Sequence, residues 1–489
     1  MSFKEYKTLD LIKVSDQISS FWKVDKTFEK SISIRGKKEF IFYEGPPSAN
    51  GMPGIHHVMA RAIKDIFCRY KTLKGFRVNR KAGWDTHGLP IELGVEKELN
   101  ISKEDIGSTI SIKDYNEACK KAVMKYTDVW NNLTERIGYW VDMENPYITY
   151  KSKYIESVWW LLKNLHDKKL IYKGYSVQPY SPKAGTGLSS HELNQPGTYQ
   201  DITDTTVTAQ FECVDESIPN FLKKYSKIYI LAWTTTPWTL PSNTALTVGE
   251  KIEYCLIKTY NLYTHQPINV VLAKELITKV FKTNFKEVSS EDELIFNNEK
   301  EIPYIVAETF LGKDIVGMKY HQIWDDSPMP NDSPENAFRL ISGDFVTTED
   351  GTGIVHTAPT FGADDAIAAK NAKPEVPPML IKNKNGDLVP LVDLQGKFVK
   401  ELGFLGGKFV KNEYYEEGKA PERSVDVEIA IKLKEENKAF RVEKYTHSYP
   451  NCWRTDKPIL YYPLNSWFIK VTNKSCLLYT SDAADDLWC

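Results

Sequence analysis

The stretch EGPPSANGMPGIHHVMARAIKDIFCRYKTLKG, Glu44 to Gly75, decides the fold, because it leads from a glycine- and proline-rich turn into a long helix. The residues just before it, 40–43, favour a short strand that ends at the glycine and the prolines. Apolar side chains then recur at helical spacing from Ile55, and Gly75 is a C-terminal stop signal. A strand, a glycine-rich turn and a helix N-terminus together predict an anion site, because unpaired N–H groups and the helix dipole face the ligand.

The predicted secondary structure changes about two-fifths of the way along the chain. Residues 76–90 predict a second strand and loop, and helical periodicity dominates 113–137 and 153–169. Such alternation predicts an α/β fold with a parallel sheet. From about Thr203 short β-rich runs separated by turn residues predict a second, mainly β domain.

Composition limits the classes of protein that fit. With 489 residues, 42% of them apolar, the chain has enough material for two or three domains. A net charge of −2 means that any surface for nucleic acid must be local. The charged N-terminus and the lack of a long apolar run predict a cytoplasmic protein outside the membrane. Seven cysteines without C-x-x-C spacing indicate reduced thiols.

One local surplus of charge lies in and after the first long helix. Residues 61–81 hold eight basic side chains against the single acidic Asp65. Such a face could meet polyphosphate or RNA, and a charge run alone is more often a solvated surface.

Three strings together point to a family. The strings GPPSANG, GIHH and GWDTHGLPIE resemble the catalytic core of class I aminoacyl-tRNA synthetases, and GWDTHGLP is similar to the isoleucyl enzymes within that class. In that family the turn carries the signature His-Ile-Gly-His, whose imidazoles help to bind ATP. Here only His57 matches a signature histidine, since Gly54 replaces the first one and His56 occupies the glycine position.

The same resemblance implies roles for three more residues. Pro46 would line the amino-acid pocket, Asn50 would lie near the nucleotide, and Asp85 would pair with the substrate ammonium. A carboxylate is the natural partner of a cation in a partly dry pocket. The alternative for Asp85 is a simple loop cap.

A second pair of strings resembles the editing domain that is inserted in isoleucyl-tRNA synthetases. These are LAWTTTPWTLPSN at 231–243 and GTGIVHTAPTFGADD at 351–365. The resemblance implies a hydrolytic pocket around the terminal adenosine of the tRNA, formed by Thr234, Thr235, Thr236 and Trp238, with His356 against the small side-chain pocket and Asp365 on the ammonium. A threonine-rich edge strand is the alternative for TTT alone. An acidic pair can also cap a helix, and we expect Asp364 to be the structural member and Asp365 the functional one.

The implied activity is ATP-dependent activation of isoleucine, transfer to tRNA(Ile) and hydrolytic editing of valyl-tRNA(Ile), by a monomer that uses ATP with Mg²⁺. A second, smaller site is needed because one missing methylene changes binding by only about 1–3 kcal/mol, a magnitude for which isoleucine against valine is the reference case. Two other classes of function stay open. The inserted domain could act alone as a deacylase, or the chain could be an RNA-binding module without enzymatic activity.

The resemblance also sets expectations about domains and metal. It predicts the first part of a Rossmann-like parallel-sheet catalytic domain at 1–200, an inserted mainly β editing domain at 201–425, a return towards the catalytic domain at 426–475 and a non-native tail at 476–489. Many relatives hold zinc with C-x-x-C pairs, and here Cys452 stands with Thr455 and Ser181 with Ala184. One thiolate cannot form a four-ligand site, so we expect no zinc. The chain has no Lys-Met-Ser-Lys-Ser loop and no helical anticodon-binding region, and we expect it to be truncated before them.

Overall fold

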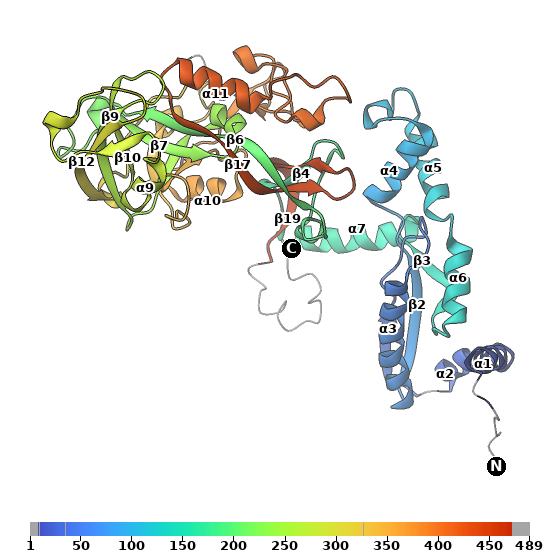
Figure 1. Cartoon of the computed structure of the whole chain (residues 1–489). Coiled ribbons are helices and arrows are strands. Elements are labelled where there is room, and N and C mark those ends of the chain that lie inside the picture. The colour runs from blue at the N-terminus through green and yellow to red at the C-terminus, as the bar shows by residue number, and fades with distance from the viewer. Residues whose placement is uncertain (1–7, 9, 35, 326, 472–489) are drawn as a thin grey trace. The chain divides into compact units, whose positions relative to one another are not determined.

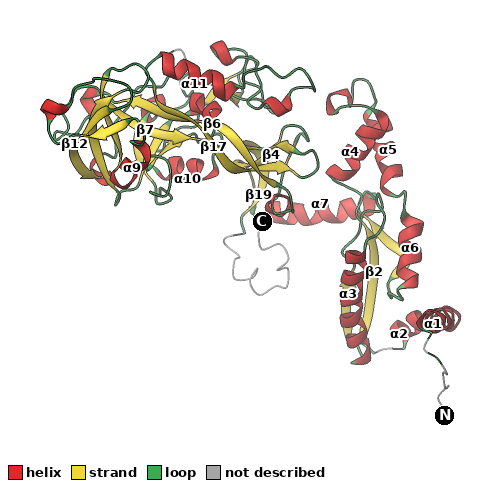
Figure 2. Cartoon of the chain, in the orientation of Figure 1, coloured by secondary structure: helices red, strands yellow, loops and turns green. Residues whose placement is uncertain are grey.

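The computed structural model describes residues 8, 10–34, 36–325 and 327–471 (Figure 1). It divides into two compact units, Met1–Ile171 and Tyr172–Cys489. Helices and strands alternate in the first unit, and strands predominate in the second (Figure 2). The non-native tail expected at 476–489 lies outside the described residues.

The first unit begins with the strand, turn and helix that the sequence predicts, and it adds a helix at 89–99 and a strand at 142–148 that the sequence analysis did not predict. Its helices and strands are α1 Leu11–Asp25, α2 Thr27–Ser33, β1 Glu39–Tyr43, α3 Ile55–Leu73, β2 Arg77–Trp84, α4 Leu89–Leu99, α5 Ile112–Val123, α6 Thr127–Arg136, β3 Asp142–Ile148 and α7 Ser152–Asp167. The predicted strand at 40–43 and the helix that begins at Ile55 are therefore confirmed.

The parallel sheet of the first unit has three strands in the order β1-β2-β3. Both pairings are parallel, and α3 forms the crossover between β1 and β2. The carboxyl ends of the three strands therefore meet at one edge of the sheet, where an open α/β sheet binds its ligands. The turn after β1 and the loop after β2 both lie at that edge.

The long helix α3 uses an unexpected face to pack. Its buried side chains are Arg61, Cys68 and Thr72. Arg61 donates to the Thr134 hydroxyl, and the Thr72 hydroxyl accepts from Arg80, so polar contacts with neighbouring elements lie on this face. In contrast, its apolar stripe is exposed, with side chains from Ile55 to Leu73. The periodicity correctly placed the helix but not the side that faces the sheet.

The second unit is mainly β. Its strands are β4 Ile171–Ser181, β5 Thr186–Gly187, β6 Tyr199–Glu212, β7 Ile228–Thr234, β8 Ala245–Val248, β9 Glu253–Tyr260, β10 Pro267–Ala273, β11 Phe285–Glu287, β12 Ile302–Leu311, β13 Arg339–Ser342, β14 Ile354–Thr357, β15 Leu380–Lys382, β16 Leu388–Pro390, β17 Ala439–Cys452, β18 Lys457–Pro458 and β19 Leu460–Ile469. Its α-helices are α8 Ser190–Leu193, α9 Ile277–Val280, α10 Ala363–Asn371 and α11 Val425–Glu435.

One large mixed sheet organises this unit. Strands run in the order β11-β12-β9-β10-β7-β14-β8-β13, and β6 joins β7 to β17. The central strand β7 is apolar and almost wholly buried, as a strand covered on both faces must be. Its last residue, Thr234, begins the threonine run, so the core of the sheet fixes where these hydroxyl groups lie.

The compact units do not divide at the domain boundaries expected from the sequence. The strand β6 crosses the boundary expected at 200/201 and pairs along its length with β17, which lies in the segment 426–475. This antiparallel pairing holds the segment expected to return to the catalytic domain within the second unit. The functional names given to these segments stay predictions.

Candidate functional site

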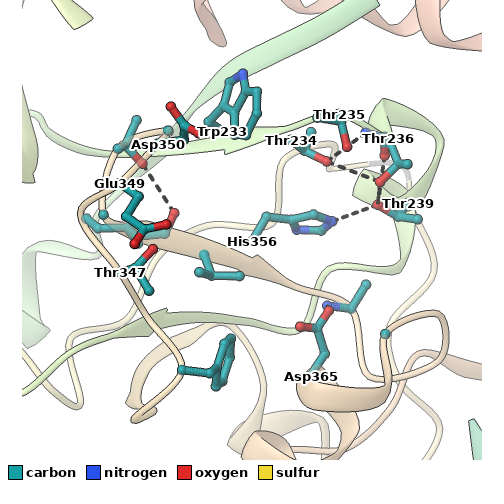
Figure 3. A pocket seen from close by; sticks show the side chains of 18 of the residues that line it. Trp233, Thr234, Thr235, Thr236, Thr239, Thr347, Glu349, Asp350, His356 and Asp365 are labelled. Atoms are coloured by element: carbon teal, nitrogen blue, oxygen red, sulfur yellow. Dashed lines mark hydrogen bonds between the residues drawn. The ribbon is translucent and has the colours of Figure 1, made fainter. Parts of the chain in front are cut away.

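A cavity of about 490 Å³ opens in the second unit where β7 and β14 end (Figure 3). We call it the threonine pocket, and its polar wall contains Thr234, Thr235, Thr236, Thr239, Thr347, Glu349, Asp350, His356 and Asp365. Figure 3 shows the threonine run and Asp365 on opposite sides of the cavity with His356 between them. The two distant strings of the sequence therefore line one hollow.

The threonine run is shaped by its own hydrogen bonds. Thr234 Oγ1 accepts from the Thr236 backbone N–H at 3.0 Å and lies 3.3 Å from the Thr236 hydroxyl. Among the described residues, the Thr235 hydroxyl has no hydrogen-bond partner, and its side chain is half-buried in the wall. Thr235 is therefore the hydroxyl of the run that is available to a ligand or a water molecule.

His356 is held in one tautomer. The Asn243 side-chain oxygen accepts from Tyr320 at 2.6 Å, so the Asn243 amide N–H₂ points to His356 Nδ1 at 2.8 Å. Since Nδ1 accepts, the proton is on Nε2, which donates to Thr239 Oγ1 at 3.0 Å. Burial lowers the pKa of His356 to about 4, so the ring is neutral. With both nitrogens engaged, His356 shapes the pocket and does not act as a base.

Asp365 faces the cavity from the first turn of α10. Its Oδ2 accepts from the Ala358 backbone N–H at 2.9 Å, which fixes the loop between β14 and α10. Burial, with a smaller effect of Asp364, raises the pKa of Asp365 to about 6. Asp364 is exposed. The structural hydrogen bond and the pocket-facing position thus belong to one residue, Asp365, and not to the pair divided as we expected.

Trp238 lies behind the threonine pocket and is not part of its wall. It is 3% exposed and packs edge-on against Phe361, which does line the cavity. Its backbone N–H donates to Asp426 of α11 at 2.9 Å. Trp238 therefore supports the pocket from the core, in a position different from the one that the resemblance implied.

The sequence analysis did not single out several other residues that line or support the pocket. Thr239 and Asn243 both lie within the quoted threonine string, and Asn243 is the residue that fixes His356. The string therefore contained the information needed to propose them. Trp233 also lies within that string, whereas Glu349 and Asp350 lie just before the second string and in no pattern that we could interpret.

In the first unit, hydrogen bonds from neighbouring elements hold the turn after β1. The Pro47 carbonyl oxygen accepts from the Asp85 N–H at 3.0 Å, and the Ala49 carbonyl oxygen accepts from the Tyr126 N–H at 2.9 Å. The Gly51 carbonyl oxygen accepts from the Trp130 indole N–H at 2.9 Å. Such a turn is a fixed cradle at the N-terminus of α3. Pro46 and Asn50 are half-buried within it.

The signature residues lie at the start of α3. His57 Nδ1 accepts from the Gly54 N–H at 2.9 Å, so the neutral ring carries its proton on Nε2 and can donate there. Burial, and then the nearby His56 and Arg61, lower the pKa of His57. The exposed His56 ring folds over Gly54 and its Cε1 lies 2.7 Å from where a Cβ would be, which is the place of the replaced histidine.

Asp85 lies at the same edge of the sheet, directly after β2. Its Oδ1 accepts from the His87 N–H at a long 3.3 Å. This contact is the loop cap that we considered as its alternative, and the half-buried carboxylate still has lone pairs for a cation.

The described residues hold no group of three or more His, Cys, Asp and Glu side chains placed to bind a metal ion. At the two places where the resemblance led us to consider C-x-x-C pairs, tight turns are closed by hydrogen bonds from the Ala184 N–H to Ser181 Oγ and from the Thr455 N–H to Cys452 O. Five cysteines of the described part are free thiols. No helix in that part has the length and apolar character needed to span a bilayer.

Comparisons with known proteins show the family to which the chain belongs. Residues 17–484 match the family model of class I tRNA synthetases (I, L, M and V). The chain is 57% identical over 486 residues to a protein of Cytophaga hutchinsonii, 56% over 487 residues to one of Bacteroides fragilis and 53% over 489 residues to one of Porphyromonas gingivalis. Each of these is named isoleucine–tRNA ligase.

The coverage of these matches is uneven. They include 96–97% of this chain, which spans only about 42% of the length of the relatives. Among solved structures, the crystal structure of GlLeuRS-CP1 aligns with 49% of the chain and 99% of its own length, at 11% identity and a TM-score of 0.32, too low to establish a shared fold. The family match extends over nearly the whole sequence, and the chain therefore belongs to the class I tRNA synthetases of the isoleucine, leucine, methionine and valine group.

Proposed function

We propose that the chain is part of an isoleucine–tRNA ligase, in which the first unit contributes to a Rossmann-like activation site and the second contains the editing site for valyl-tRNA(Ile). The observation that carries the proposal is the threonine pocket, where Thr235 and Asp365 line one cavity. The names of the relatives supply the substrates, isoleucine, ATP and tRNA(Ile). Such an enzyme works in the cytoplasm, and we propose a monomer.

In the editing reaction, a water molecule attacks the ester carbonyl carbon of the misattached amino acid. The bond from that carbon to the ribose oxygen breaks, and the ribose oxygen takes up a proton. Asp365 pairs with the α-ammonium, and the free Thr235 hydroxyl orients the water or the terminal ribose. His356 holds Thr239 through Nε2–H, which keeps the threonine run in shape.

Selection in this pocket follows from its rigidity. His356 is fixed on both ring nitrogens, so its ring cannot move aside for a larger side chain. The activation site alone discriminates poorly between isoleucine and the smaller valine. An editing site that admits valine and excludes isoleucine adds a second selection step.

In the first unit, the proposed activation chemistry is the attack of the isoleucine carboxylate on the α-phosphate of ATP. His57 Nε2–H would donate to a phosphate oxygen, and the half-buried Asp85 would pair with the substrate ammonium. Mg²⁺ would come with the ATP phosphates, as it prefers substrate oxygens to an all-protein cage. The described residues offer no such cage, so the metal would supply charge neutralisation to the phosphates themselves.

Hydrolysis of valyl-tRNA(Ile) by the chain tests the editing proposal. The unaltered protein should release valine, and Asp365→Ala should slow this release about 10- to 150-fold, which corresponds to a lost charge-assisted hydrogen bond of roughly 1.5–3 kcal/mol. Thr235→Val, which leaves every hydrogen bond of the run in place, should also lose activity without losing stability. Equal rates for the unaltered protein and both variants would refute the proposal.

A second candidate function is deacylation alone. It is favoured by one observation, that every residue of the threonine pocket lies in the second compact unit. Exchange of pyrophosphate into ATP in the presence of isoleucine separates the two candidates, because only the complete ligase reaction requires it.

A further inference from the structure

A cavity of about 820 Å³ lies in the second unit, where the strands β15, β16 and β19 contribute to its wall. We call it the apolar pocket. It shares no described lining residue with the threonine pocket, and nothing in the proposed activation or editing chemistry uses it. Its volume is within the range of clefts that enclose a drug-sized molecule.

Apolar side chains form most of the wall of this cavity. Four prolines, four leucines, three valines and two tyrosines make up 13 of the 17 described residues that line it, so the body of a ligand has to be apolar. Three of them remain in contact with solvent, since Tyr175 is 56%, Leu394 49% and Leu388 41% exposed. Large apolar side chains that stay exposed around one hollow mark a binding surface.

The wall is held by hydrogen bonds that do not involve a ligand. The Tyr462 hydroxyl donates to the Val392 carbonyl oxygen at 2.9 Å, and the Val399 N–H donates to the Leu391 carbonyl oxygen at 2.9 Å. The prolines of the wall add fixed backbone angles. A ligand therefore does not have to order these segments when it binds, which favours affinity.

Asp393 is the only charged residue among the described residues of this wall. Its Oδ1 accepts from the N–H groups of Gln395 and Lys397 at 3.0 and 2.9 Å, which fixes the half-buried side chain in a turn. Within the described part of the chain, Oδ2 has no hydrogen-bond or ion-pair partner. A carboxylate oxygen in an apolar surrounding is stabilised by a cation that hydrogen-bonds to it.

The charge of the wall limits the class of ligand. The described wall contains no lysine, arginine or histidine, so a phosphate, a carboxylate or a zwitterionic amino acid would have an unpaired negative group there. One carboxylate is too few to hold a metal ion. The uncharged polar residues are Thr360, Gln395 and Asn465, which can orient a ligand but cannot match the many polar groups of a sugar or a nucleotide.

We propose that the apolar pocket binds a small amphiphilic amine, with its apolar body against the prolines and leucines and its ammonium group on Asp393 Oδ2. Charge complementarity selects this occupant, because the wall offers one unpartnered negative group in an apolar surrounding. The inference goes beyond the proposed function, since none of these residues takes part in the reactions described above.

Three probes of one skeleton test the proposal. Diphenylpropylamine carries a cation, whereas diphenylpropanol is neutral and diphenylpropanoic acid carries an anion. Calorimetric titration into the full chain should give the amine an affinity about tenfold higher than that of the alcohol, and the acid should bind more weakly than the alcohol. Added salt should reduce the preference for the amine, because it screens a partly exposed ion pair.

Asp393→Asn is the decisive variant, because its side-chain oxygen can still accept from the Gln395 and Lys397 N–H groups. It should bind the amine and the alcohol equally. Leu394→Ser, at a half-exposed position, should weaken both by about threefold. Asp387→Asn is the matched control, since Asp387 is an exposed aspartate directly before β16 that does not line the cavity, and it should leave the preference unchanged.

Equal affinities for the three probes, or no binding of the amine, would overturn the proposal, and so would a preference for the amine that survives in Asp393→Asn. If that variant does not fold, the order of the three affinities and the effect of Leu394→Ser decide. Sedimentation that shows a dimer broken by Leu394→Ser, with no amine bound, would assign the cavity to a second copy of the chain and also overturn the proposal. None of these results depends on deacylation, so this inference and the proposed function stand or fail separately.

Discussion

The buried carboxylate of Asp365 should lower the free energy of unfolding of the protein at neutral pH. Its pKa rises from 3.8 to about 6 because burial disfavours the ionised form. The folded state therefore holds the proton more tightly than the unfolded state, and stability falls as the pH rises from about 4 to 6. The difference corresponds to about 3 kcal/mol at neutral pH, an upper figure because the pKa is good to about one unit.

The substitution Asp365→Asn removes this cost. An asparagine can still accept from the Ala358 N–H but cannot ionise, so the variant should be more stable than the unaltered protein at pH 8 by about 1–3 kcal/mol, after allowing for a weaker hydrogen bond. With pKa values of 3.8 and about 6, the gain should grow by about 1.4 kcal/mol between pH 5 and pH 8. The same variant should lose deacylation, because the ammonium loses its partner.

Urea unfolding followed by tryptophan fluorescence at pH 5 and pH 8 measures the gain, and comparison of variant with unaltered protein cancels groups common to both. Asp364→Asn is the control, because Asp364 is exposed and should change stability by less than about 0.5 kcal/mol. A gain for Asp365→Asn that is equal at the two pH values, or a loss at pH 8, would refute the reasoning.

Three other predictions concern the supports of the pocket. Thr239→Val should cost about 1–3 kcal/mol in urea unfolding, because the His356 Nε2–H loses its buried acceptor, whereas Thr347→Val in the same wall should cost less than about 0.5 kcal/mol. Nitrogen NMR should show His356 neutral with its proton on Nε2 from pH 8 to pH 5, and an imidazolium signal at pH 6 would contradict this assignment. Because the pKa of His356 is lowered to about 4, the free energy of unfolding should fall as the pH drops from 6.5 towards 4. Asp426→Ala should destabilise by about 3–5 kcal/mol, since it leaves the buried Lys411 with one carboxylate fewer, and a loss within 1 kcal/mol would show that the network is not coupled.

Local patterns in the sequence predicted local structure well. The strand before Glu44, the helix from Ile55 and the helical segments to residue 169 follow from apolar spacing and from glycine and proline. The threonine string and the His-Asp string were found because each combines unusual residue types within a few positions. What spacing could not give was the face of α3 that packs, because polar contacts, such as that of Arg61 with Thr134, lie on it.

Contacts between distant segments were beyond the reach of the sequence. The pairing of β6 with β17 joins segments that are more than 200 residues apart, and both strands lie in the second unit.

The support of the threonine run shows why its position depends on residues far from it. Asp426 accepts from the Trp238 N–H, and Lys411 lies between Asp426 at 3.7 Å and Asp204 at 3.0 Å. Burial lowers the pKa of Lys411, but these carboxylates, with Tyr449 beside it, raise the pKa overall, so the lysine stays charged. Asp204 belongs to β6 and Asp426 to α11, and the buried Lys411 therefore ties this strand to the helix that holds the turn after the threonines. A change in Lys411 should then disturb the threonine pocket from behind, although Lys411 does not line it.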